Sequence, residues 1–194
     1  MTGEHMKVLK GPTTMLYPCP VALVTCTGGS GKDDIVTLAW VGVADSTPPI
    51  ITAGIRPTRY SAGLINKSRE FVVNIPTVSL LEKVDYCGSV SGFDVKKFET
   101  TGLTREHASK VKAPMIKECP VNLECKLRRT ILLGSHRLYL GEVLETHIEE
   151  SIIDSKGGID YEKAQPFVYN AREYWSMGKN IGLYGFSKGM LRQS

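Results

Sequence analysis

Two apolar, β-branched runs stand close together in the chain: Ile35-Val36-Thr37-Leu38-Ala39-Trp40-Val41-Gly42-Val43 and Ile50-Ile51-Thr52-Ala53-Gly54-Ile55. Residues of this kind are enriched in strands because their side chains pack well on a pleated surface. Ser46-Thr47-Pro48-Pro49 lies between the runs and has the composition of a turn. The sequence therefore predicts one long strand, a turn and a second strand.

Fixed positive charge and hydroxyl groups follow the second run, in the sequence Arg56-Pro57-Thr58-Arg59-Tyr60-Ser61. Thr58 is the expected N-cap of a helix that runs to about Asn66. A helix N-terminus offers unpaired N–H groups, and a guanidinium adds a bidentate donor fork, so this cluster has the chemistry of a phosphate site. Capping residues are common, however, and a solvated loop leading into an ordinary helix explains the same residues.

Further strands are predicted on both sides of this region. The expected set is Val21–Thr27, Glu70–Ile75, Val121–Leu127 with an extension to Leu133, Leu138–Glu149 and Phe167–Tyr169. Polar Asn122, Glu124 and Lys126 alternate with apolar residues, a pattern typical of a half-exposed antiparallel strand. On the next strand, His147 is expected to face solvent. Short helices are predicted after Thr77 and over Phe93–Glu99.

The composition narrows the class of protein. The chain has 194 residues, 42% hydrophobic and 23% charged, with a formal net charge of +4. These values are ordinary for a single globular domain, and the basic residues are scattered among acidic ones, so we expect no nucleic-acid partner. The polar start and the absence of a long apolar run lead us to expect neither a signal peptide nor a membrane span, and hence a cytoplasmic protein.

Cysteine spacing and the glycine-rich loop argue against two other kinds of site. The five cysteines are odd in number and include no Cys-x-x-Cys pair, so we expect free thiols rather than disulfides or a metal site. The loop Gly28–Asp34 precedes a strand, whereas a phosphate-binding P-loop requires a helix there and a different spacing. We interpret it as a hairpin turn.

The order of elements, with many strands and two or three short helices, predicts a mainly β fold: an antiparallel barrel with helices covering its openings. Residues 1–16 are expected to form a flexible lead, residues 17–170 the barrel domain, and residues 171–194 an aromatic tail. That tail carries Tyr174, Trp175, Tyr184 and Phe186, which suggests that it packs on the barrel or on a second subunit.

These segments, taken in order, resemble the flavin reductase-like family, and its flavoredoxin branch above all. The resemblance rests on Pro20–Thr27, Val36–Trp40, Pro48-Pro49, Arg56–Ser61, Phe71–Pro76, Asp94–Phe98 and Gly134-Ser135-His136 with Gly141-Glu142-Val143. It implies an FMN-binding split β-barrel, usually a homodimer with the flavin near the subunit interface. Many two-component flavin reductases have Gly-Asp-His where this chain has Gly134-Ser135-His136. The missing aspartate argues against efficient use of NADH.

The resemblance also implies a set of cofactor-binding residues. The strand Thr37-Leu38-Ala39-Trp40 is expected to line the isoalloxazine, and the turn at Asp45 and Ser46 to touch its polar edge. Arg56, with Thr58, Tyr60 and Ser61, matches the phosphate-binding loop, and Lys97 matches a basic residue near the cofactor. His136 is either a nicotinamide-side or substrate-side residue or a structural turn histidine. No catalytic residue and no metal ligand is otherwise expected.

Two functions follow from the resemblance. The first is an oxidoreductase that moves electrons from NAD(P)H or a redox protein through FMN to free flavin, a ferric complex or a partner protein. The second is a flavoredoxin-type carrier that retains FMN and has no NAD(P)H activity. A more distant alternative is a pyridoxamine-phosphate-oxidase-like barrel with another ligand or none.

Overall fold

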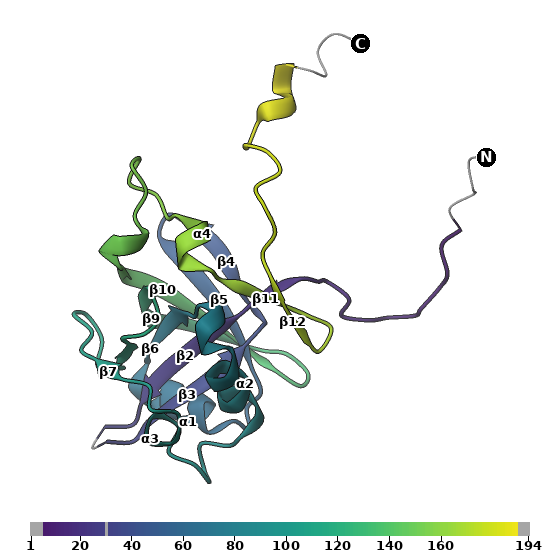
Figure 1. Ribbon diagram of the computed structural model, residues 1–194. Coiled ribbons are helices and arrows are strands. Elements are labelled where there is room, and N and C mark those ends of the chain that lie inside the picture. Colours follow the sequence, from purple (N-terminus) through teal and green to yellow (C-terminus); the bar gives the residue numbers. More distant parts are fainter. Residues whose placement is uncertain (1–5, 30, 190–194) are drawn as a thin grey trace.

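Seven antiparallel strands form the main sheet, in the order β3-β2-β6-β9-β10-β5-β4 (Figure 1). The computed structural model describes residues 6–29 and 31–189. The strands of this sheet are β2 (Ala22–Thr27), β3 (Asp33–Leu38), β4 (Val41–Ser46), β5 (Pro49–Ile55), β6 (Glu70–Ile75), β9 (Val121–Leu132) and β10 (Arg137–Ile148). The expected mainly β, antiparallel barrel is confirmed.

The prediction of a single strand over residues 35–43 is wrong. The run is divided into two strands, and this division allows the barrel to close. The chain bends at Ala39 and Trp40, so that β3 pairs with β2 while β4 pairs with β5. The strands β3 and β4 are therefore the two opposite edges of the sheet, although only these two residues separate them in sequence. Such a short connection is possible only because the sheet curls until its edges approach each other.

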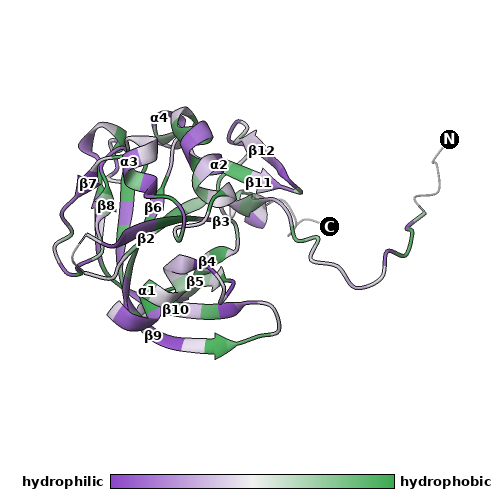
Figure 2. Cartoon of the chain, turned by 90° about the horizontal axis from the view of Figure 1, so that it is seen from below, coloured by the Kyte–Doolittle hydropathy of each residue, from purple (hydrophilic) through white to green (hydrophobic). Residues whose placement is uncertain are grey.

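The curled sheet encloses the main apolar core. In Figure 2 the strands β2, β3 and β6 lie across from β4, β5, β9 and β10. Buried side chains from both halves meet between them, among them Val24, Val36, Ile55, Phe71 and Tyr139. Helix α1 (Tyr60–Ser68) adds Ala62, Leu64 and Ile65 to this core and so closes one opening of the barrel.

The helices begin later than the sequence suggested. The N-cap of α1 is Arg59 rather than Thr58, and its side chain makes no capping hydrogen bond. The helix after Thr77 is a 3-10 turn, η1 (Val78–Leu80), followed by α2 (Leu81–Ser89). The expected helix at Phe93–Glu99 is the shorter α3 (Lys97–Thr101). The remaining short helices are η2 (Glu150–Ile152), α4 (Tyr161–Ala164) and η3 (Phe186–Gly189).

The polar face of β9 is covered at Asn122 and Glu124, whereas Lys126 is exposed as the sequence predicted. The connection from Thr104 to Pro120, with its short strands β7 (Arg105–Glu106) and β8 (Met115–Ile116), packs over the covered part. The Glu124 carboxylate is completely buried and accepts hydrogen bonds from the backbone amides of residues 109–111. His147 is bonded to the same carboxylate through Nε2, at 2.6 Å, so it is not a free surface residue. Local alternation cannot reveal such coverage by a distant segment.

A second sheet, β1-β11-β12, lies where the chain enters and leaves the body. Its strands are β1 (Cys19–Pro20), β11 (Phe167–Asn170) and β12 (Glu173–Ser176). Two arms extend from this sheet (Figure 1): the N-terminal arm, residues 6–16, and the C-terminal arm, residues 177–189. Tyr174 packs on the body, whereas Ile181 is 98% exposed and Leu183 is also exposed.

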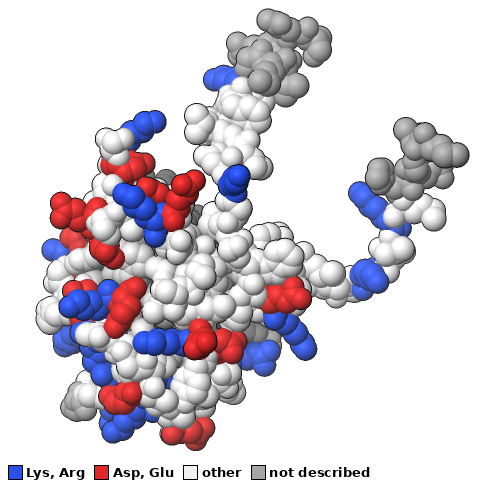
Figure 3. All heavy atoms as spheres, in the orientation of Figure 1, with Lys and Arg blue, Asp and Glu red and all other residues white. Residues whose placement is uncertain are grey.

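Charged side chains of both signs are interspersed on the face drawn in Figure 3. Within the described ranges, 6–29 and 31–189, no helix has the length and apolar character needed to span a membrane.

Candidate functional site

A pocket of about 410 Å³ opens where the two edges of the main sheet approach each other. The bend between β3 and β4 forms one wall, and the end of β5, helix α2, the β9–β10 turn and the β1-β11-β12 sheet complete it. The lining residues are Tyr17, Val21, Val36, Thr37, Leu38, Ala39, Trp40, Gly54, Ile55, Arg56, Arg59, Asp85, Gly88, Ser89, His136, Tyr169 and Tyr174. This volume falls within the range of small-molecule sites.

The bend segment is fixed on both sides. Thr37 Oγ1 donates a 2.5 Å hydrogen bond to the Val84 carbonyl of α2, and the Gly54 amide donates to the Trp40 carbonyl at 2.8 Å. A Cβ atom at position 54 would lie 3.3 Å from the Trp40 Cβ, a tight contact. These contacts hold the segment Thr37–Trp40 in one well-defined conformation where it lines the pocket. All four residues that the sequence assigned to the flavin ring line this pocket.

Two arginines contribute to the pocket lining. Arg56 follows β5 and Arg59 precedes α1, so the turn between them brings both into the lining. Arg59 Nη2 donates to the Gly88 carbonyl at 3.3 Å. Among the described residues, neither arginine forms an ion pair with a carboxylate. Positive charge that a protein leaves uncompensated in a concave site favours an anionic ligand.

The His136 ring packs at a tilt against the Trp40 ring in the pocket lining. The ring centroids are 4.5 Å apart with an interplanar angle of 46°, and Ser135 Oγ lies 2.8 Å from His136 Nδ1. Partial burial and the nearby Arg56 charge lower the pKa of His136 below its ordinary value. The imidazole is therefore neutral at neutral pH, and its role in positioning a nicotinamide or another substrate stays a prediction.

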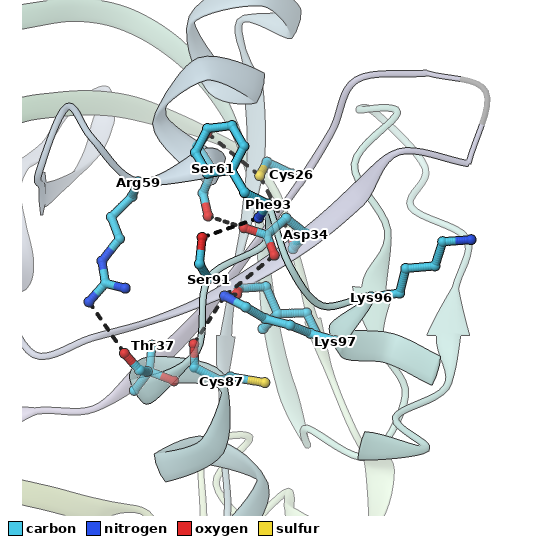
Figure 4. A network of polar contacts seen from close by, with 12 residues as sticks. Cys26, Asp34, Thr37, Arg59, Ser61, Cys87, Ser91, Phe93, Lys96 and Lys97 are labelled. Atoms are coloured by element: carbon cyan, nitrogen blue, oxygen red, sulfur yellow. Dashed lines mark hydrogen bonds and ion pairs between the residues drawn. The ribbon is translucent and has the colours of Figure 1, made fainter. Parts of the chain in front are cut away.

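Lys97 and Ser61 do not reach the pocket lining. Both lie in a buried network around Asp34 (Figure 4). Lys97 Nζ donates to the carbonyls of Ile35, at 2.5 Å, and Cys87, at 3.1 Å, and lies 3.4 Å from Asp34 Oδ1. The Ser61 hydroxyl donates to Asp34 Oδ2. These contacts use the donors of the ammonium group, so Lys97 supports the wall behind the pocket, and its contact with a cofactor stays a prediction.

The remaining predicted residues also lie outside the lining. Thr58 is exposed, and the Tyr60 ring packs against Phe93 with centroids 4.9 Å apart. At the far end of β4, the Asp45 carboxylate accepts hydrogen bonds from the amides of Ser46 and Thr47, at 2.7 and 3.2 Å. The structure thus separates the turn at Asp45 and Ser46 from the other expected site residues.

Several lining residues were not expected from the sequence. Tyr17 precedes β1 and Asp85 lies on α2, whereas Tyr169 and Tyr174 lie on the consecutive strands β11 and β12, far along the chain from both. Only the register of β1 on β11, with Cys19 opposite Tyr169, brings two of them together. No local signal marks them, because an aspartate on a short helix and tyrosines in short strands are common.

The fold and the pocket define an antiparallel split-barrel protein with a cationic small-molecule site. The sequence profile of the flavin reductase like domain matches residues 14–178, and the chain belongs to this family. An uncharacterized protein of Archaeoglobus fulgidus is 36% identical over 166 residues, which cover 86% of this chain and 88% of the relative.

Two solved structures are also similar. The flavoredoxin of Desulfovibrio vulgaris (Miyazaki F) is 31% identical with a TM-score of 0.87, over 95% of this chain and 100% of the other. The flavoredoxin of Methanosarcina acetivorans is 29% identical with a TM-score of 0.88, over 95% and 99% of the two chains. The resemblance inferred from the sequence is thereby confirmed at the level of family and fold.

Proposed function

We propose that this protein binds FMN in the pocket between β3, β5 and α2, with the phosphate on Arg56 and Arg59 and the ring against Thr37–Trp40. The observation that carries the proposal is the presence of two guanidinium groups without carboxylate partners, among the described residues, in the same pocket as an ordered, largely apolar segment. A phosphate monoester on a flat ring system has this combination of properties. The flavoredoxins among the similar structures support the assignment.

The residues of this chain have distinct parts in such a site. The arginines hold the phosphate through charge-assisted hydrogen bonds. The bend segment, held by Val84 and Gly54, offers backbone groups at the ring's edge and excludes water from one side. FMN supplies the redox chemistry itself, accepting and donating electrons singly or in pairs. No acid–base pair of side chains is required for that chemistry.

Comparison of FMN with riboflavin tests the proposal directly, because the two molecules differ only by the phosphate. Calorimetric titration should show FMN binding more tightly than riboflavin by at least tenfold. Arg56→Ala and Arg59→Ala should each weaken FMN binding by about tenfold or more, since charge-assisted hydrogen bonds contribute about 1.5–3 kcal/mol, and should leave riboflavin nearly unaffected. Lys67→Ala removes an exposed charge at the other end of α1 and serves as the control. Equal affinities for the two ligands would refute the assignment.

We infer that the bound flavin serves electron transfer, either in an NAD(P)H-dependent oxidoreductase or in a flavoredoxin-type carrier. Similarity to two flavoredoxins favours the carrier, and Ser135 in place of an aspartate beside His136 points the same way. Oxidation of NADH or NADPH that saturates with added FMN would identify the reductase. A yellow protein that neither nucleotide reduces, but that a reduced ferredoxin bleaches, would identify the carrier.

We also propose that the protein is a homodimer. Both arms carry large apolar side chains that contact little of their own body, including Met6, Leu9, Ile181, Tyr184 and Phe186. The body exposes further apolar residues, Val43, Leu132 and Leu133. In a dimer, the arms of one copy would cover exposed apolar residues on the body of the other. Both sets of side chains would then be removed from water. Sedimentation equilibrium should give twice the monomer mass of 21.3 kDa, and a monomer at micromolar concentration would refute this.

A further inference from the structure

Three tyrosines and one aspartate form a separate part of the pocket wall, which we name the aromatic corner: Tyr17, Asp85, Tyr169 and Tyr174. The tyrosines come from the segment before β1 and from β11 and β12, whereas Asp85 lies on α2. None of them belongs to the residues assigned above to the phosphate or to the bend segment. The proposed function therefore leaves this group unexplained.

The tyrosine rings are steeply inclined to one another. Tyr17 and Tyr169 have centroids 6.1 Å apart at 61°, and Tyr169 and Tyr174 have centroids 6.0 Å apart at 67°. Both pairs are edge-to-face, so the three rings are not stacked flat against one another, and all three residues line the pocket. All three side chains are half-buried, which leaves them partly accessible from the pocket.

Asp85 is tied to this group by a hydrogen bond. The Tyr174 hydroxyl donates to Asp85 Oδ1 at 3.0 Å. Burial and this carboxylate raise the pKa of Tyr174 to about 12, so the phenol stays protonated and keeps donating through the neutral range. Asp85 is exposed and forms no ion pair with a lysine or arginine elsewhere in residues 6–29 and 31–189, and its second carboxylate oxygen accepts no hydrogen bond there.

Aromatic faces and an unpaired carboxylate are complementary to one kind of ligand. The face of an aromatic ring carries partial negative charge and attracts cations, an effect that grows when the site is partly shielded from water. The carboxylate adds a full negative charge beside the rings. Tyr169 and Tyr174 also pack in part on the core around the buried Phe167, whose ring centroid lies 5.8 Å from that of Tyr174, and both residues still contribute to the pocket lining.

We propose that the aromatic corner binds a small, planar organic cation. Arg56 and Arg59 make another part of the pocket positive, so one cavity holds both an anion-binding and a cation-binding subsite. Cation binding at the aromatic corner does not depend on the proposed function. Only its consequence does, namely that the bound cation shares the pocket with the flavin. The corner then selects positively charged over neutral or anionic small molecules as reaction partners of that flavin.

Two probes with the same bipyridine skeleton test the proposal: methyl viologen, a dication, and 4,4′-bipyridine, which is neutral at pH 7.5. Calorimetry on the purified protein should show saturable binding of methyl viologen and at least tenfold weaker binding of bipyridine. Asp85→Asn should weaken viologen binding three- to tenfold without changing bipyridine binding. Tyr169→Leu should weaken it by a similar factor. Glu82→Gln, which removes an exposed charge from the same helix, is the matched control and should have no effect.

The comparison of the two probes on the unmodified protein requires no substitution, so it remains decisive even if a variant does not fold. Equal or absent binding of both probes overturns the proposal, as does viologen binding that Asp85→Asn leaves unaltered. The flavin titration described above is run on the same preparations. Viologen binding that depends on Asp85 in a protein that does not bind FMN would uphold the aromatic corner and reject the proposed function.

Discussion

Lys97 Nζ lies 3.4 Å from Asp34 Oδ1, and the side chains are only 3% and 2% exposed. The pair joins β3, α2 and the first turn of α1, since Lys97 also binds the carbonyls of Ile35 and Cys87 and Asp34 accepts from Ser61. The Lys97–Asp34 pair therefore holds the end of α2 beside β3. The carbonyl of Gly88, the residue after Cys87 at this end of α2, accepts the hydrogen bond from Arg59, one of the two pocket arginines.

Removal of this ammonium group should strongly destabilise the protein. Lys97→Met leaves the Asp34 carboxylate buried without its counter-ion, and breaking a buried ion pair in this way costs about 3–5 kcal/mol. The free energy of unfolding from urea titration should fall by that amount. Lys96→Met is the matched control, because its side chain is exposed and points away from the network in Figure 4. A similar loss in both variants would contradict the structural role.

Glu124 should make stability depend on acid pH. Burial by itself raises the pKa of this carboxyl, but the amides of residues 109 and 110 and the His147 ring outweigh that effect and hold its pKa at about 2. The unfolded value is about 4.3, so the stabilisation is complete above that pH and is lost as the pH falls towards 2. The whole contribution is about 3 kcal/mol. Urea titrations between pH 6 and pH 2 should show this loss.

Glu124→Gln should flatten that pH dependence and lower stability at neutral pH, because the amide cannot accept the same set of hydrogen bonds. The exposed Glu145, on the same strand as His147, provides the control substitution Glu145→Gln. An unchanged pH profile in Glu124→Gln would show that other carboxyls govern the acid limit.

Two glycine substitutions should change the free energy of unfolding in opposite directions. A Cβ atom at position 141 would come within 2.3 Å of Phe71 Cζ and 3.1 Å of Cys125 Cβ in the main core. Gly141→Ala should therefore lower the free energy of unfolding by about 1–3 kcal/mol through overpacking. Gly63→Ala meets nothing within 4 Å on the exposed side of α1 and should raise it by about 0.5–1 kcal/mol through helix propensity. Calorimetric melting of the two variants checks both directions.

The cysteines should be slow to react while the protein is folded. Burial raises the pKa of Cys87 to about 11 and that of Cys125 to about 12, and it raises the pKa of Cys26 and Cys119 as well. The thiolate is the reactive species. No more than one thiol, that of the half-buried Cys19, should react quickly with a disulfide reagent at pH 8. Cys19→Ser should remove that fast phase, and rapid reaction of a second thiol would contradict the burial.

Within the proposed site, the sequence identified the local parts. The resemblance to the family pointed to Thr37–Trp40, and the local chemistry of the cationic turn pointed to an anion site at Arg56; all of these residues line the pocket. The resemblance also rests on the order of these segments along the chain, which is the order seen in the family. Nothing in the sequence indicated that Lys97 is buried. A lysine in a polar segment has the same local pattern whether or not a buried carboxylate lies close enough to pair with it.

The chain by itself determined the strands β2, β5, β6, β9 and β10, since alternating or continuous apolar runs leave few other ways to bury those side chains. Only the tertiary structure decided that the run at residues 35–43 is cut at Ala39 and Trp40, because the two edges of a curled sheet must be joined there. It also decided the aromatic corner and the covered Glu124. Each of these depends on contacts between segments far apart in the chain, which local periodicity does not encode.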